Sequence, residues 1–162
     1  MALAQKNTKK FENILELYGD LIYDICVNIL WSSSLGQVAF KTTMKEIKHE
    51  LKANPYFDYK RAFVLKITYE KLGFAYQKNI KKLTPAEQIM LDTYLSLNDK
   101  INQFDSYFHR LPFADMFLLL IRDKHGLPYT EIAAAMNTSE DSLKTQRQMA
   151  YRTLEEWIWE TQ

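Results

Sequence analysis

Residues 126–154 read GLPYTEIAAAMNTSEDSLKTQRQMAYRTL, and their turn-forming residues are the clearest structural signal in the chain. Gly126 suits a helix end where the backbone takes a positive φ, and Asn137 is the usual substitute for glycine in such a turn. Thr130 and Ser139 are expected to cap the helices that follow them, because their side-chain oxygens can accept hydrogen bonds from free N–H groups. The stretch therefore predicts two helices joined by a tight turn.

Another helix is predicted in front of this stretch, from Leu111-Pro112 to about Lys124. Proline fits the first helical turn, where its missing N–H has no partner to lose. The apolar residues that follow recur at helical spacing, namely Met116, Phe117, Leu119, Leu120 and Ile121. Residues 111–154 together are typical of a helix-turn-helix, whose last helix can enter the major groove of DNA. The alternative is a plain helical hairpin, which the turn residues at 126, 137 and 139 disfavour.

The composition indicates an all-α protein. The chain has 162 residues, of which 47% are hydrophobic and 14% aromatic, and it contains only four Gly and four Pro. The single cysteine, Cys26, cannot form an internal disulfide, which is typical of a reducing compartment. No apolar run has the length of a membrane span, and residues 1–6 lack the apolar core of a signal peptide. A cytoplasmic protein is expected.

The net charge of +1 hides an asymmetry along the chain. Residues 1–83 carry 14 Lys/Arg and 8 Asp/Glu, a net charge of +6, whereas residues 84–125 and 126–162 have net charges of −2 and −3. Much of the affinity of a DNA-binding protein comes from the neutralisation of phosphates. The predicted helix-turn-helix is therefore expected to bind DNA weakly by itself, and the basic surface belongs to the front half.

Three helices are predicted in that front half. The first covers about residues 9–30, and the second follows the serines at 32–34 and ends near Leu51, before Asn54-Pro55. The third, over about residues 58–78, has two apolar sides. One side would serve the core with Leu65, Tyr69, Leu72 and Tyr76, and the other holds Phe63, Ile67 and Phe74.

The second side of this third helix mixes aromatic rings with cations. Four lysines flank the side, and the mixture continues toward the start of the helix: Lys60, Lys66, Lys71 and Lys78, with Tyr56, Phe57, Tyr59 and Arg61. One interpretation is a helix buried on both sides, with its lysines reaching out to water. The other is a surface for single-stranded nucleic acid, where rings stack on bases and lysines follow the phosphates.

A boundary between two domains, residues 1–83 and 84–162, is predicted after the IKKL stretch at 80–83. Thr84-Pro85-Ala86-Glu87 has the pattern of a capping box with proline at the first helical position, so the connector is expected to be helical to about Leu95. A helix over about residues 98–110 would follow. No enzyme is expected, because the three histidines are dispersed and neither a zinc cluster nor a phosphate-binding glycine loop is present.

This order of parts resembles the bacterial sigma factors, in particular their small two-domain extracytoplasmic-function group. The resemblance covers about residues 11–156. It is strongest in LP at 111–112, LPYTEIA at 127–133 and SLKT at 142–145, where the family has LP, LSYEEIA and TVKS. The front half matches more loosely, with KTTM at 41–44 in the place of a QETF motif and FVLKITY at 63–69 in the place of WLYRIAR.

The resemblance implies a function in transcription initiation, without a catalytic residue, metal or cofactor. The second helix would dock on the clamp of core RNA polymerase through Lys41, Met44, Lys45 and Lys48. The third helix would hold the non-template strand of promoter DNA, with Lys60, Arg61, Lys66, Tyr69 and Lys71 as candidates. The last helix would read duplex DNA through Lys144, Thr145, Gln146 and Arg147, with Arg152 on a phosphate. An anti-sigma factor would be a further partner.

The chain departs from the family pattern at some of these places. Val38 and Thr42 stand where the second helix of the family carries Asp and Glu, and Glu70 stands where a base-reading Asn is usual. The last helix has less positive charge than the family at Asp141, Gln146 and Met149. Two alternatives to a working sigma factor are therefore a sigma-like protein that acts by protein contact, such as an anti-sigma decoy, and a conventional helix-turn-helix regulator.

Overall fold

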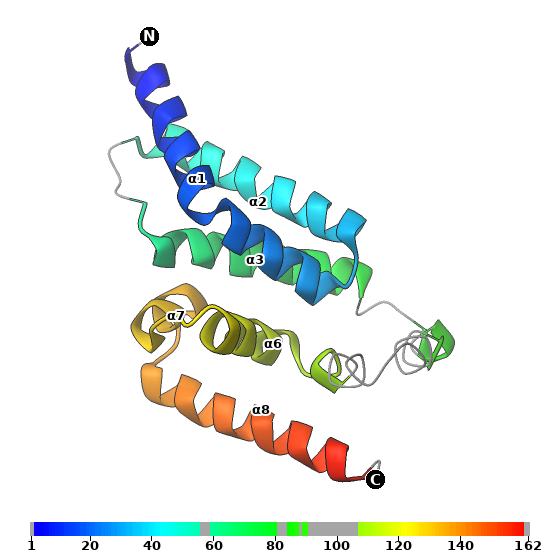
Figure 1. Cartoon of the computed structure of the whole chain (residues 1–162). Coiled ribbons are helices and arrows are strands. Elements are labelled where there is room, and N and C mark those ends of the chain that lie inside the picture. The colour runs from blue at the N-terminus through cyan, green and yellow to red at the C-terminus, as the bar shows by residue number, and fades with distance from the viewer. Residues whose placement is uncertain (1, 56–58, 81–83, 88, 91–106, 161–162) are drawn as a thin grey trace.

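The computed structural model describes residues 2–55, 59–80, 84–87, 89–90 and 107–160. Every regular element in these residues is a helix, which confirms the predicted all-α fold class. Figure 1 shows the helices α1, α2 and α3 as one group, with α6 and α7 packed beneath them and α8 on the opposite side of α6 and α7. No helix in the described part of the chain combines the length and apolar character needed to cross a membrane.

The front group consists of α1 (Ala2–Leu30), α2 (Ser33–Ala53) and α3 (Arg61–Asn79). All three predicted helices are present. α1 begins much earlier than predicted, whereas α3 begins slightly later. Tyr56 and Phe57 lie outside the described residues.

Local hydrogen bonds set the ends of α2 as the sequence indicates. The Ser32 Oγ accepts a hydrogen bond from the Leu35 backbone N–H at 3.1 Å, which caps the start of the helix. At the other end Asn54 is the C-cap, and its backbone N–H donates to the Glu50 carbonyl. The following Pro55 has no N–H to continue the helix.

The core of the front group is aliphatic and tightly enclosed. Ile22, Ile25, Ile47 and Leu65 have no exposed surface. Cys26 is buried in the same core, and burial raises the pKa of its thiol to about 12. The thiol is therefore protonated at neutral pH and is a packing residue.

The close approach of α1 and α2 depends on Gly36. A Cβ atom at this position would lie 2.6 Å from Val27 Cγ2 and 2.8 Å from Val27 Cα. The first atom could turn away, but the second belongs to the backbone of α1. Only a residue without a side chain lets the two helices pack at this distance.

The second group consists of α6 (Phe113–Leu119), a π-helical turn η1 (Leu120–Lys124), α7 (Tyr129–Met136) and α8 (Glu140–Glu160). The π-helical turn was not predicted, because its apolar spacing is the same as that of an α-helix. In this turn the His125 backbone N–H donates to the Leu120 carbonyl, five residues back, at 3.3 Å.

Three of the four predicted turn and cap residues around α7 are confirmed. Gly126 has φ 67° and Asn137 has φ 53°, both in the left-handed region. Ser139 caps α8, since its Oγ accepts a hydrogen bond from the Ser142 backbone N–H at 3.1 Å. The predicted cap at Thr130 is wrong: α7 is already helical at Tyr129, because Pro128 has a fixed φ that leads directly into the helix. The helix-turn-helix itself stays an interpretation of this arrangement.

The connector is described only in part. The predicted capping box is confirmed, because the Thr84 backbone N–H donates to Glu87 Oε2 at 2.9 Å and the Glu87 backbone N–H donates to Thr84 Oγ1 at 3.2 Å. Residues 85–87 and 89–90 are helical. Most of the helix predicted over residues 98–110 lies outside the described residues.

The two groups pack against each other mainly through α3 and α7, with α6 lying along α1 and α3. Where α6 meets α3, the centre of the Phe113 ring lies 5.3 Å from that of Tyr69 and 5.4 Å from that of Tyr76. Gly73 of α3 provides the space, since a Cβ there would lie 3.3 Å from the Phe113 ring. Tertiary packing of aromatic rings therefore joins the two halves of the chain.

A half-buried histidine links the end of α1 to the turn before α6. The His109 ring packs edge-on against Trp31 with a centroid distance of 3.8 Å, and its Nε2 donates a hydrogen bond to the Asn28 carbonyl at 2.6 Å. Burial lowers the pKa of His109 from 6.5 to about 2. The imidazole is therefore neutral in the folded chain.

We expect Gly36→Ala to destabilise the fold by about 1–3 kcal/mol, as overpacking of a close helix crossing does. The matched control is Gly19→Ala in α1, where the nearest atom to a new Cβ is Leu15 Cδ1 at 3.2 Å, on a flexible side chain. That change should be close to neutral or slightly stabilising, because alanine favours helix. Urea unfolding of both variants measures the difference, and equal stability would contradict the close crossing.

We expect the free energy of unfolding to fall as the pH drops from 7 to 5. The unfolded chain binds a proton at His109 near pH 6.5, whereas the folded chain does not bind it until about pH 2. Stability is fully present above pH 6.5 and decreases below it by about 1.4 kcal/mol per pH unit. Denaturant unfolding at several pH values should show this slope for the natural chain, and His109→Gln should remove it. An unchanged slope in the variant would contradict the assignment.

Candidate nucleic-acid interface

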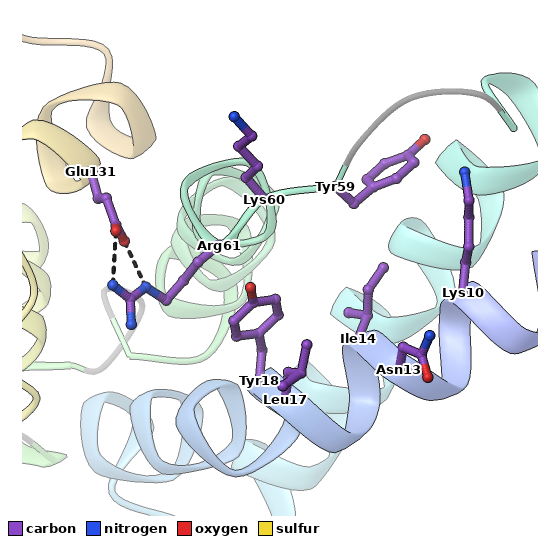
Figure 2. Close-up of a pocket in the computed structure, with 9 residues that line it drawn as sticks. All are labelled: Lys10, Asn13, Ile14, Leu17, Tyr18, Tyr59, Lys60, Arg61 and Glu131. Carbon is purple, nitrogen blue, oxygen red and sulfur yellow. Dashed lines mark hydrogen bonds and ion pairs between the residues drawn. The ribbon is translucent and has the colours of Figure 1, made fainter.

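A pocket of about 480 Å³ lies at the start of α3, the helix for which a surface for single-stranded nucleic acid is one of two interpretations of the sequence. Figure 2 shows the residues that line it, which come from α1, from the segment before α3, from the first residue of α3 and from α7: Lys10, Asn13, Ile14, Leu17, Tyr18, Tyr59, Lys60, Arg61 and Glu131. Three of these residues are cationic and one is acidic. Rings, aliphatic groups and cations are thus combined in one concave surface.

The three cations of this pocket are held differently. Lys10 Nζ donates to the Pro55 carbonyl at 2.6 Å. Arg61 is paired with Glu131 of α7, since its Nε and Nη2 donate to the two carboxylate oxygens at 2.6 and 2.8 Å. The hydrogen bonds to Glu131 raise the pKa of the guanidinium. Lys60 is exposed, and within the described residues it forms no ion pair.

The aromatic wall of the pocket is fixed by the backbone of α2. The Tyr59 hydroxyl donates to the Glu50 carbonyl at 2.6 Å, and its ring packs edge-on against Phe63 at 5.1 Å. Burial raises the pKa of this phenol. Tyr18, on α1, forms the other aromatic side. Tyr59 is only 9% exposed and belongs to the core, so it shapes the wall of the pocket, and the half-buried ring of Tyr18 is the one open to a ligand.

The second side of α3, for which the sequence left two interpretations, contains residues that support each of them. Ile67 is buried and Phe63 is half-buried, as expected for a helix with core on both sides. Phe74 is 73% exposed, and Lys66 and Lys78 are exposed as well. Lys71 is half-buried, with its Nζ 3.8 Å from Glu46 Oε2 of α2, so this candidate is partly neutralised.

Tyr69 is not on the open side of α3. Its ring stacks on Phe113 at 5.3 Å and lies edge-on to Phe117 at 4.9 Å, inside the contact between the two groups. Burial raises the pKa of its hydroxyl. In this arrangement of the chain Tyr69 cannot stack on a base, because α6 occupies the face of its ring.

Two polar side chains of α8 are already bound within their own group. Gln146 Nε2 donates to Asp115 Oδ1 at 2.7 Å. Arg147 donates from Nη2 and Nε to the Asp123 carboxylate, with the shortest distance 2.7 Å, and Tyr151 donates to the same carboxylate. The hydrogen bonds to Asp123 raise the pKa of Arg147. A DNA base would have to compete with these carboxylates.

The other candidate DNA-binding residues on α8 lie on its exposed surface. Thr145 and Arg152 are exposed, and Lys144 is exposed with its Nζ 5.7 Å from the centre of the Tyr129 ring. A groove beside them is lined by Asp115, Asp141, Ser142, Thr145, Gln146 and Met149. Two of these six residues are acidic, which disfavours phosphate close to the groove.

The residues that the resemblance assigns to polymerase docking divide into two kinds. Lys41, Lys45 and Lys48 are exposed on α2. Met44 is 6% exposed and belongs to the core, so its assignment to a partner surface is corrected. The signal was available in the sequence, because Met44 shares one side of the helix with Ile47 and Leu51.

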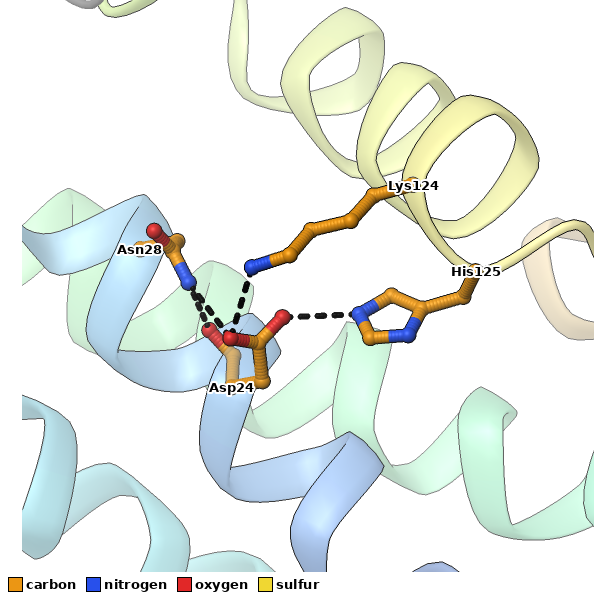
Figure 3. Close-up of polar contacts among 4 residues, drawn as sticks. All are labelled: Asp24, Asn28, Lys124 and His125. Atoms are coloured by element: carbon orange, nitrogen blue, oxygen red, sulfur yellow. Dashed lines mark hydrogen bonds and ion pairs between the residues drawn. The ribbon is translucent and has the colours of Figure 1, made fainter.

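Two polar contacts between the groups were missed by sequence reasoning. One is the pair of Arg61 with Glu131, and the other joins α1 to η1 (Figure 3). Asp24 accepts from Lys124 Nζ at 2.8 Å and from His125 Nε2 at 2.7 Å. Burial alone would raise the pKa of Asp24, but these hydrogen bonds outweigh burial and lower it. No local pattern could reveal partners that lie so far apart in the chain.

Among the described residues no group of His, Cys, Asp and Glu is arranged to hold a metal ion. Comparison of the chain with protein-family models and with curated proteins found no match.

Proposed function

We propose that this chain is a sigma-like transcription factor that directs core RNA polymerase to promoter DNA. The observation that carries the proposal is the pocket at the start of α3, where Lys10, Lys60 and Arg61 stand beside the half-buried ring of Tyr18. Stacking on rings together with cationic contacts to phosphates is how unpaired nucleic acid is bound without a base-pair partner. The order of sequence motifs along the chain supports the same assignment.

The second part of the proposal concerns α7 and α8. The chain turns through Gly126 and Asn137 and presents Lys144, Thr145 and Arg152 on the exposed side of α8. A helix held in this way fits the major groove of a promoter element. Because its neighbours are acidic, it contributes specificity more than affinity, and the front group supplies most of the attraction to DNA.

A sigma-like protein that acts by protein contact, for example on an anti-sigma factor, is the second candidate. It is favoured by the carboxylates that engage polar groups proposed to contact DNA: Asp115 accepts a hydrogen bond from Gln146, and Asp123 and Glu131 form ion pairs with Arg147 and Arg61. Such a protein would present the shape of a sigma factor without the free cations that hold DNA.

We expect the purified chain to form a stable complex with core RNA polymerase and to open a cognate promoter. Lys60→Ala combined with Lys66→Ala should impair opening by about tenfold for each lost phosphate contact, since a hydrogen bond to a charged group is worth about 1.5 kcal/mol. Complex formation with core polymerase should change much less. Co-purification and promoter opening measure the two steps separately, and the absence of a complex at low salt would contradict the proposal.

We expect Glu131→Gln to raise the affinity for a single-stranded oligonucleotide by about fivefold, because a half-exposed ion pair worth about 1 kcal/mol no longer occupies Arg61. Glu140→Gln is the matched control, since it removes the same charge from an exposed position at the start of α8. Fluorescence anisotropy measures both. Equal gains in the two variants would show a general charge effect and would contradict a specific role of Arg61.

A further inference from the structure

Four lysines form a row along the exposed side of α2. Lys41, Lys45, Lys48 and Lys52 are spaced by four, three and four residues, which places them on one side of the helix. All four are exposed. Lys48 also covers the Phe11 ring of α1, with its Nζ 5.5 Å from the ring centre. The row is part of the excess of positive charge in the front half.

No carboxylate of α2 neutralises this row. The acidic residues of the helix, Glu46 and Glu50, are half-buried on the side that faces α3, where Glu46 meets Lys71 and Glu50 lies beside Tyr59. Within the described part of the chain none of the four lysines takes part in an ion pair. A row of like charges without internal compensation leaves a positive potential that an anionic partner can use.

The row is also open in this arrangement of the chain. The second group packs on α1 and α3, and in Figure 1 α2 lies on the side of the front group away from α8. The contacts that engage Arg61 and Tyr69 do not reach it. The row is therefore accessible even while Glu131 of α7 occupies part of the pocket at the start of α3.

The composition of this face points to the kind of partner. The centres of protein–protein interfaces are poor in lysine and rich in aromatic residues, methionine and arginine. On α2 the only large hydrophobic side chain that is exposed, within the described residues, is Val38 at 63%, and Leu3 of α1 lines a hollow beside Lys48 and Lys52. Neither side chain is aromatic and the four lysines outnumber them, so this face suits a ligand that presents mainly charge.

The length of the row suits a nucleic-acid backbone. At 1.5 Å per residue the row spans about 16 Å, a length of duplex that carries several phosphates. We propose that Lys41, Lys45, Lys48 and Lys52 bind the sugar–phosphate backbone of duplex DNA without sequence preference. This ligand differs from the polymerase clamp that the resemblance places on α2, and its test needs no polymerase.

The test uses the full chain and a DNA hairpin of arbitrary sequence, whose closed stem offers no long single strand to the pocket of α3. Lys45→Gln with Lys52→Gln should lower the slope of log Kd against log salt by about 1.8, or about 0.9 for each lost contact. Lys9→Gln with Arg110→Gln is the matched control, because the two substitutions remove the same charge from exposed side chains that belong neither to the row nor to a surface assigned to DNA. The control pair should leave the slope unchanged. Circular dichroism checks that both variants keep their helices.

Three results would overturn the proposal. The first is no binding of the hairpin at low salt. The second is an equal loss in the two pairs of variants, which would show that net charge alone is responsible. The third is binding of poly-glutamate as tightly as DNA, lost through the same substitutions, which would indicate an acidic protein surface as the partner. None of these results bears on Lys60 or on the pocket at the start of α3, which are tested with single-stranded DNA and core polymerase, so failure of the row is distinct from failure of that part of the proposed function.

Discussion

The arrangement of this molecule depends on the packing of Phe113 against α3. The ring is held between Tyr69 and Tyr76, in space that Gly73 leaves open. Aromatic rings bury a large area and orient one another, so this contact fixes α6 on the front group, beside the direct packing of α7 on α3. The ion pair of Arg61 with Glu131 and the contacts of Asp24 with Lys124 and His125 join the same two groups at other points.

The same interface decides which surfaces are available to a ligand. Docking of α7 brings Glu131 into the pocket at the start of α3, and docking of α6 covers the ring of Tyr69. An ion pair within the second group also makes a candidate residue less available to a ligand, because the Asp123 carboxylate binds Arg147. Functional groups that look free in the sequence are thus partly engaged in the folded chain. The row of lysines on α2 escapes this because it lies on the other side of the front group.

Features that depend on neighbours in the chain were predictable. Ser32, Ser139 and the pair of Thr84 and Glu87 accept the hydrogen bonds expected of caps, and Asn137 takes the left-handed conformation. Local predictions were wrong or incomplete where the same residues fitted two structures. Thr130 is not a cap because Pro128 starts the helix earlier, and the π-helical turn is invisible in a spacing that fits an α-helix equally well.

The sequence by itself determined the all-α class, the positions of the turns and the basic character of the front half, because each follows from side-chain chemistry over a few residues. Only the tertiary structure decided which of the predicted contact residues are open. Glu131 meets Arg61 and His125 meets Asp24 across long stretches of chain, and Asp123 binds Arg147. Such contacts result from the packing of whole helices, which no local pattern of residues encodes.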